Sequence, residues 1–288
     1  MSRCPKCNSY LSSSKSNFCS VCGHKLRDVI IEEENGFLTQ NDNGVVSLIR
    51  YTGNETNLII PSYVNIISRE SFYDNKAIEI VDIGDGVIII EQGAFDCQNL
   101  RKIRIRKQLK SCKDSIWNAS KLEGVFYDGT LDDWLELNYK PSKAYPVLFK
   151  SLGGEYLFGS ERYEALTRID LSQYHKDLLP DKFVGFDKLE SFVFPKTTKV
   201  IKHGTFFHCK NLKNIVFPDY LEAIEYRAFF GCDSLESIHL PNSLKLIDDA
   251  FSFCGNLKTV YFKGTPKEWN KIKNKSEEIK NCRIVYQN

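Results

Sequence analysis

The fold of this chain follows from three consecutive segments: PKTTKVIKHGTFFHCKNLKNIVF (residues 195–217), PDYLEAIEYRAFFGCDSLESIHL (218–240) and PNSLKLIDDAFSFCGNLKTVYF (241–262). Each segment places an aromatic residue three positions before a cysteine and a leucine three positions after it. The aromatic residues are Phe206, Phe229 and Phe251, the cysteines are Cys209, Cys232 and Cys254, and the leucines are Leu212, Leu235 and Leu257. A unit this short cannot bury its own apolar face, so the period predicts a solenoid of stacked units.

Each unit divides into two extended pieces and a turn. Its closing pattern, L-x-x-I-x-(L/F), has the period-two alternation of a short strand. Pro195, Pro218 and Pro241 follow these strands, where a residue without an N–H can end the pairing. The middle of the unit, for example residues 224–229, is too short for a long helix. It predicts a second extended piece followed by a tight helical turn.

These repeats resemble the BspA-type leucine-rich repeat family, whose units combine a proline, a short V-x-x-I piece, A-F-x-x-C and L-x-x-I-x-I. Residues 61–83 and 84–105 are two more copies, and residues 106–127 and 172–194 are degenerate ones. The resemblance implies a mostly β leucine-rich repeat solenoid of about seven units. A fold of this kind does not define a function, which must be argued from a site.

Composition narrows the class of protein. The 288 residues are 42% hydrophobic, which suffices for a core, and the formal charge of +2 gives no overall field that attracts nucleic acid or an anionic membrane. The start MSRCPKC has no apolar signal-peptide core, and no apolar run is long enough to span a membrane. Cysteines at buried repeat positions favour a reducing compartment, so we expect a cytoplasmic protein.

Residues 1–27 carry two C-x-x-C pairs, Cys4 with Cys7 and Cys19 with Cys22. Four thiolates at this spacing suit a tetrahedral Zn²⁺. The segment is almost devoid of aliphatic residues, so metal binding must replace a hydrophobic core. It resembles the short zinc ribbons at the N-termini of many bacterial proteins. We expect one structural Zn²⁺, because no coordination position is left open. A redox C-x-x-C needs a βαβ context that the sequence lacks.

The remaining chain predicts a linker and two repeat cassettes. Residues 28–44 are acidic and turn-rich and predict a linker with one strand. Cassette 1 covers residues 45–140, and cassette 2 covers residues 141–288 with a C-terminal cap. A hairpin within residues 153–171 is expected to restart the sheet, and residues 282–288 to close it.

Two related segments predict helical caps, FYDGTLDDWLEL (residues 126–137) and YFKGTPKEWNKI (261–272). In both, a threonine and an acid have the spacing of a capping box. The pairs are Thr130 with Asp133 and Thr265 with Glu268. We expect Trp134 and Trp269 to cover the exposed ends of the two repeat stacks.

No catalytic motif is found. The sequence lacks G-x-S-x-G, a phosphate-binding loop, a dinucleotide-binding glycine motif and H-E-x-x-H. His203, His208 and Cys209 are close in sequence, but Cys209 takes a buried repeat position and the histidines align with turn positions. Asp248 and Asp249 are adjacent turn acids without a partner base. We therefore expect no enzyme and no small-molecule substrate.

The remaining candidates are surfaces. In cassette 2, Val193, Val216, His239 and Tyr261 occupy outward positions of successive strands and predict one column. Solvent-facing apolar and aromatic residues favour docking of a protein partner. We call these four residues the strand-face column.

In cassette 1, Lys102, Arg104 and Arg106 share the outward face of one strand, and the ribbon adds five basic side chains and no acid. These charges support an alternative, nucleic-acid binding. A third hypothesis is a surface or adhesion role, which the exported members of the resembled family imply. The favoured hypothesis is a non-catalytic protein-interaction module with an unidentified protein partner.

Overall fold

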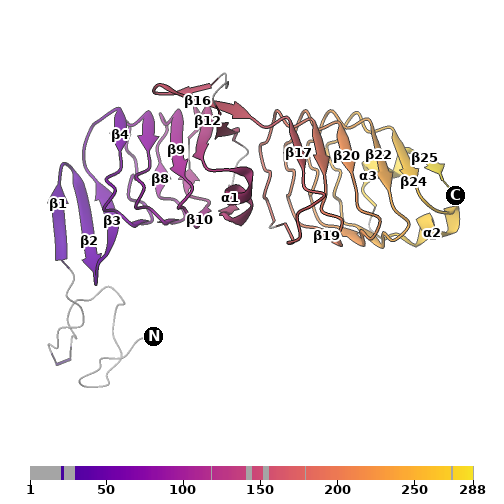
Figure 1. Ribbon diagram of the computed structural model, residues 1–288, viewed down its shortest axis with the longest axis horizontal. Helices are drawn as coiled ribbons and strands as arrows, with labels where there is room; N and C mark the ends of the chain where they lie inside the picture. The colour runs from indigo at the N-terminus through magenta and orange to yellow at the C-terminus, as the bar shows by residue number, and fades with distance from the viewer. Residues whose placement is uncertain are drawn as a thin grey trace.

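The computed structural model describes residues 21–22, 30–117, 119–140, 145–151, 156–178, 180–273 and 275–287. The described residues from 30 onward form an elongated solenoid (Figure 1). The described chain is mostly β, as the repeat pattern predicts. Of the predicted zinc ligands, Cys4, Cys7 and Cys19 lie outside the described residues, and Cys22 is exposed.

One side of the solenoid, here called the strand face, is built from the closing strand of each unit. In the first half the parallel strands are β4 (Asn57–Ile59), β6 (Ile80–Asp82), β9 (Lys102–Arg106), β12 (Gly124–Asp128) and β14 (Val147–Lys150). In the second half they are β17 (Arg168–Asp170), β18 (Ser191–Val193), β20 (Asn214–Val216), β22 (Ser237–Leu240), β24 (Thr259–Phe262) and β25 (Arg283–Tyr286). The register places equivalent repeat positions side by side, as where Phe192 pairs with Ile215.

A second row of strands comes from the middle piece of each unit. The first half has β3 (Val45–Tyr51), β5 (Ile66–Ile67), β7 (Ile89–Ile90), β10 (Ser111–Lys113) and β13 (Asn138–Lys140), with a separate pair β8 (Phe95–Asp96) and β11 (Ile116–Trp117). The second half has β19 (Val200–Ile201), β21 (Ala223–Ile224) and β23 (Leu246–Ile247). The predicted second extended piece is confirmed.

The core repeats with the sequence. The rings of Phe206, Phe229 and Phe251 stack at centroid distances of 5.1 and 5.0 Å. The repeat cysteines are buried, and each reaches a backbone carbonyl of the preceding unit, with Cys232 Sγ 3.3 Å from the oxygen of Phe206. Stacking of the units therefore gives each buried thiol a hydrogen-bond acceptor and each buried ring a neighbouring ring. A single buried cluster extends from the first strands of the solenoid to its C-terminal cap.

The prediction of a linker over residues 28–44 is wrong for its described part. Strands β1 (Ile30–Glu34) and β2 (Phe37–Asp42) form an antiparallel hairpin, and β2 pairs with β3. The turn between them is made by two residues with positive φ, Asn35 at 50° and Gly36 at 80°. The acidic composition suggested a linker, but one face of this hairpin covers the first repeat, as the burial of Phe37 shows.

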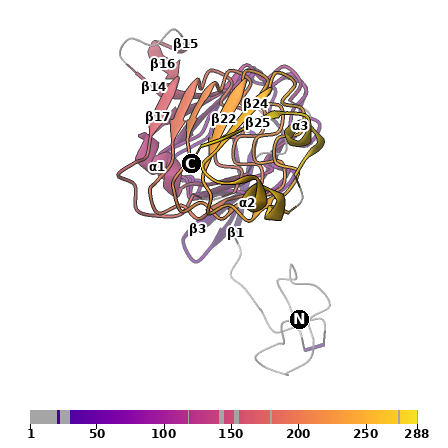
Figure 2. The ribbon, with the colours of Figure 1, turned by 90° about the vertical axis from the view of Figure 1, so that its right-hand side faces the viewer.

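The predicted cassette boundary at residue 140 also does not divide the sheet. Strand β14 pairs parallel with β12, and the hairpin of β15 (Tyr156–Phe158) and β16 (Glu161–Ala165) continues the same sheet in antiparallel direction. The hairpin therefore ends the first sheet, and β17 begins the next one by pairing with β18. Both views show the hairpin projecting beyond the body of the solenoid (Figures 1 and 2).

The two predicted helices are confirmed, but only α2 covers an exposed end of the solenoid. Helix α1 (Leu131–Glu136) and helix α2 (Pro266–Lys271) both begin with complete capping boxes. Helices α2 and α3 (Glu277–Lys280) lie at the C-terminal end (Figure 2), where Trp269 is buried as expected. The position predicted for Trp134 is wrong. It lies between the two halves, fully buried, with its ring 5.8 Å from that of Phe186.

Candidate protein-binding surface

In the second half of the solenoid, the strand face turns alternate residues of β17, β18, β22 and β24 toward solvent. In β22 and β24 the apolar repeat residues point inward, while His239 is exposed and Tyr261 is half-buried. Strand alternation fixes this division, because neighbouring side chains of a strand lie on opposite faces. The sequence pattern therefore decides which residues can meet a partner.

The register places the four residues of the strand-face column in two neighbouring pairs. Val193 lies beside Val216, and His239 lies beside Tyr261, by direct strand register. The rings of His239 and Tyr261 stack at 4.5 Å with an interplanar angle of 10°, and Val216 is 57% exposed. Register continues the line to Val285 on β25. Sequence reasoning missed Val285, although the alternation of the closing strand signalled it.

A polar line runs parallel to this column, two positions earlier in each strand. Its members are Ser191, Asn214, Ser237 and Thr259. Small hydroxyl and amide groups here offer hydrogen bonds without charge beside the apolar line. The surface thus combines an apolar strip with a hydrogen-bonding strip, the mixture found in protein interfaces.

The three basic residues of β9 share one face, as the sequence predicts, with burial alternating along the strand. However, the two arginines have carboxylate partners within the fold. Arg104 donates to Asp82 and to Glu161, and its side chain is only 13% exposed. Lys102 lies 3.9 Å from Glu123 in a looser ion pair.

Arg106 completes this ion-pair network. Its guanidinium donates to Asp82 at 2.8 Å and to Asp128 at 2.7 Å, and its Nε donates to the carbonyl of Ile83 at 3.1 Å. Burial works against the charged form of Arg104, but the hydrogen bond with Asp82 prevails and holds its pKa above the ordinary value. These contacts compensate the positive charge inside the fold. They leave little of it for phosphate groups.

The hairpin β15–β16 explains why these arginines are covered. Phe158 and Tyr163 pack on Phe126 at ring distances of 5.3 and 5.1 Å, outside the main core. The guanidinium of Arg104 lies 4.7 Å from the ring centroid of Phe158. Sequence reasoning missed this second cluster. The sequence did contain one indication of this cluster. Phe126 is a large apolar residue at an outward position of β12, between the inward residues Val125 and Tyr127.

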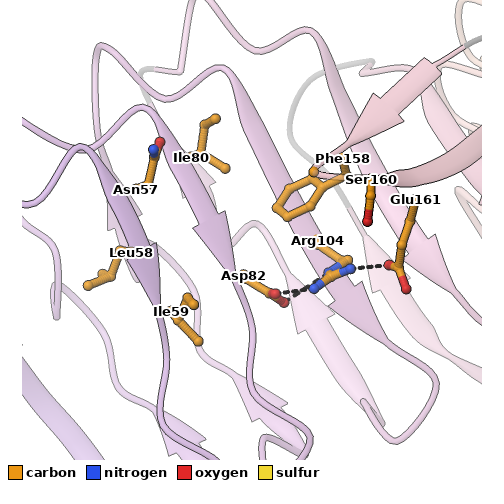
Figure 3. A pocket seen from close by; sticks show the side chains of 10 residues that line it. Asn57, Leu58, Ile59, Ile80, Asp82, Arg104, Phe158, Ser160 and Glu161 are labelled. Atoms are coloured by element: carbon orange, nitrogen blue, oxygen red, sulfur yellow. Dashed lines mark hydrogen bonds and ion pairs between the residues drawn. The ribbon is translucent and has the colours of Figure 1, made fainter.

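A groove of about 480 Å³ opens between this hairpin and strands β4 and β6 (Figure 3). Its walls include Phe158 and Ile80, and Arg104 with its two carboxylates closes one end. The charged groups are already paired with one another, and Ile59 at the outer wall is 70% exposed. The groove therefore makes the strand face concave beside the hairpin.

His208 and Cys209 take the turn and buried positions that the repeat predicts for them. His208 adopts φ 59° at a turn, and Cys209 is buried with its Sγ 3.1 Å from the carbonyl of Phe183. Burial raises the pKa of the Cys209 thiol, so it is protonated and a poor nucleophile. Within the described parts of the chain, no three His, Cys, Asp or Glu side chains gather where they could hold a metal ion.

Comparison with known proteins identifies the repeat family. A family model described as "BspA type Leucine rich repeat region" matches residues 50–137 and 177–286 in six copies. The seventh unit of the sequence-based count remains a prediction. No curated protein matches. None of the helices in the described ranges is long and apolar enough to cross a bilayer.

Several solved structures are similar in fold. A leucine-rich cell surface protein from Faecalibacterium prausnitzii is 16% identical with a TM-score of 0.36, covering 86% of this chain and 98% of that one. The leucine-rich repeat protein of T. pallidum is 19% identical with a TM-score of 0.31, covering 86% and 99%. The pneumococcal vaccine antigen PcpA is 15% identical with a TM-score of 0.35, covering 90% and 99%.

Proposed function

This chain belongs to the BspA-type leucine-rich repeat family, and we propose that it is a non-catalytic protein-binding module that contacts its partner through the strand-face column. The observation that carries this proposal is that two pairs, Val193 with Val216 and His239 with Tyr261, place apolar and aromatic side chains beside a line of small polar ones. Val216 is 57% exposed, and the stacked rings of His239 and Tyr261 present a rigid surface.

Two properties suit this surface to be the energetic centre of an interface. Aromatic side chains contribute large contact areas at a small cost in conformational entropy, and here stacking has already fixed both rings. The parallel polar line supplies hydrogen bonds at the rim. Because the supporting strands belong to the core of the solenoid, a partner meets a preformed surface.

Site-specific photo-crosslinking tests this proposal. A photo-reactive amino acid replaces Val216, and the matched control carries it at Tyr220, which is 71% exposed at a turn outside the column. We expect one protein to be crosslinked from position 216 and not from position 220. Equal crosslinking from both positions, or none from position 216, would contradict the proposal.

We also propose that Cys4, Cys7, Cys19 and Cys22 hold one structural Zn²⁺. The chemistry of the donor set supports this, because four thiolates in two C-x-x-C pairs match the ligands of closed zinc sites. Bound zinc would supply the folding free energy that the aliphatic-poor segment lacks. A cytoplasmic location follows from the same chemistry and from the buried thiols of the repeats, and cell fractionation tests it.

Nucleic-acid binding is the weaker proposal for cassette 1. Arg104 and Arg106 are engaged with Asp82, Asp128 and Glu161, so a phosphate would have to displace a carboxylate. The basic ribbon could still contribute. A steep loss of affinity with rising salt would support nucleic-acid binding.

A further inference from the structure

The turns of the second half carry an aromatic row that the strand-face column does not use. Phe207 and Phe230 stack at 4.9 Å with an interplanar angle of 12°, and Phe230 lies 4.7 Å from Phe253. Each residue comes from the turn of a different repeat, so the row crosses three units. We call Phe207, Phe230 and Phe253 the turn-face row.

Phe253 is the least expected member of this row. It has φ +63°, in the left-handed region, and its side chain is 69% exposed. The equivalent positions of the two preceding repeats are His208 at φ 59° and Gly231 at φ 68°. A bulky residue is strained in this conformation, whereas glycine adopts it freely. Folding alone gains little from an exposed phenylalanine here, which points to a role in contact.

A cation and a second stack flank the row. The guanidinium of Arg227 lies 4.8 Å from the ring centroid of Tyr226 and 5.1 Å from that of Phe230. His203 stacks on Tyr226 at 5.8 Å. The middle repeat thus places an oriented arginine at the centre of an aromatic surface, a combination enriched at the centres of interfaces.

Charge changes sign along the same turns. The first repeat contributes Lys202, the second contributes Glu225 and Arg227, and the third contributes Asp248 and Asp249. Lys202 lies 4.0 Å from Glu225 within one copy, but both side chains are 38% exposed, so Lys202 can also face a partner. The order is therefore positive, balanced and negative. A surface with this order complements itself when a second copy is turned by 180° about its centre, because each positive end then meets a negative end.

We propose that the turn-face row binds a second copy of this chain in an antiparallel two-fold dimer. The axis passes near Phe230 and Arg227. Phe253 then packs against Phe207 of the partner subunit, and Asp248 faces Lys202 of the partner subunit. The contact uses the turns, so the strand face of each copy stays available.

Sedimentation velocity on the full chain over a concentration series tests this dimer. We expect a reversible shift from the 33.2 kDa monomer to twice that mass. Phe253→Gly should raise the dimer dissociation constant by about tenfold or more. The melting temperature of the monomer should stay equal or rise, because glycine suits the left-handed backbone. Tyr220→Ser, a change at an equally exposed aromatic, should leave the dissociation constant unchanged.

Charge reversal distinguishes this geometry from non-specific association. Asp248→Lys and Lys202→Glu each place like charges opposite one another, so each variant alone should dimerise more weakly. An equimolar mixture of the two should restore dimers, because both contacts of the mixed pair are again between opposite charges. A wild type that stays monomeric at all concentrations, or a mixture without recovery, would overturn the proposal.

Discussion

Lys182 joins the two halves of the molecule, although it is a lysine with no exposed surface. Its Nζ donates to the carbonyl of Trp134 at 2.8 Å and to that of Leu137 at 2.5 Å. In return, the indole Nε1 of Trp134 donates to the carbonyl of Lys182 at 3.1 Å. The ammonium thus satisfies carbonyls at the C-terminal end of helix α1, where a positive charge is also favoured by the helix dipole.

Burial lowers the pKa of Lys182 from 10.5 to about 8, with Glu136 opposing the shift. Between these values the unfolded chain binds the proton more tightly than the folded chain, so stability should rise as pH increases. Relative to Lys182→Met, we expect the free energy of unfolding of the wild type to increase by about 1.5 kcal/mol between about pH 8 and pH 9.5. Urea denaturation at several pH values measures this difference. Parallel pH profiles of wild type and variant would contradict it.

Sequence reasoning succeeded at residues that the repeat constrains and failed at residues that long-range packing constrains. The burial of Cys209, Cys232 and Cys254 follows from their shared position in the period. Lys182 precedes Phe183 in a degenerate copy, and its role depends on a helix 48 residues away. A local sequence pattern cannot predict a contact between residues that are 48 positions apart.

At the scale of elements, the capping boxes of α1 and α2 are alike locally but differ in their surroundings. Helix α1 is enclosed by both halves, while α2 covers the C-terminal end of the solenoid (Figure 1). In α2, Thr265 Oγ1 accepts from the backbone N–H of Glu268 at 3.3 Å, and the Glu268 carboxylate accepts from the Thr265 N–H at 2.8 Å. The second interaction lowers the pKa of Glu268.

Thr265→Ala should therefore destabilise the chain by about 1 kcal/mol, because an N-terminal N–H of α2 loses its acceptor. Chemical denaturation measures this change. Thr265→Ser, which keeps the hydroxyl, is the matched control and should be close to wild type. An alanine variant with unchanged stability would show that the cap is not needed at this end.

The proposed zinc ribbon predicts a separate response. Cys4→Ser should release the metal and unfold residues 1–27 while the solenoid keeps its melting temperature, because one lost ligand opens the site. Metal content by mass spectrometry and calorimetry of the same sample check both parts. Cys97→Ser is the control, since this buried repeat cysteine should affect the solenoid and leave the metal content unchanged. Equal loss of solenoid stability in Cys4→Ser would show that the ribbon packs on it.

The hairpin β15–β16 marks the limit of prediction for elements. Its two strands were expected, but their partners were not, because strand alternation does not specify which edge a hairpin joins. The pairing depends on Phe158 and Tyr163 meeting Phe126. That contact is visible only in three dimensions.

At the scale of the whole molecule, one core unites the two predicted cassettes. The rings of Trp134, Phe149 and Phe186 bridge the joint, at distances of 5.8 to 6.1 Å. The repeat period predicted the architecture, but the joint lies in the stretch where the period is interrupted. Continuity of the core therefore could not be predicted from the sequence.

Trp134→Ala should cost about 3–5 kcal/mol and separate unfolding into two transitions, because the substitution leaves a cavity where the halves meet. Trp269→Ala at the free end is the matched control. It should loosen only the C-terminal cap. Calorimetry together with hydrogen exchange locates each change. If Trp134→Ala unfolded in a single transition at the melting temperature of the wild type, the two halves would not depend on a shared core.

Affinity capture from native lysate, with and without nuclease, tests whether the strand face binds a protein. The baits are the wild-type chain and a variant with His239→Ala and Tyr261→Ala. We expect one nuclease-resistant protein that the wild type retains and the double variant loses, while both chains keep the same melting temperature. Retention of that protein by the double variant, or its loss on nuclease treatment, would contradict a protein-binding strand face.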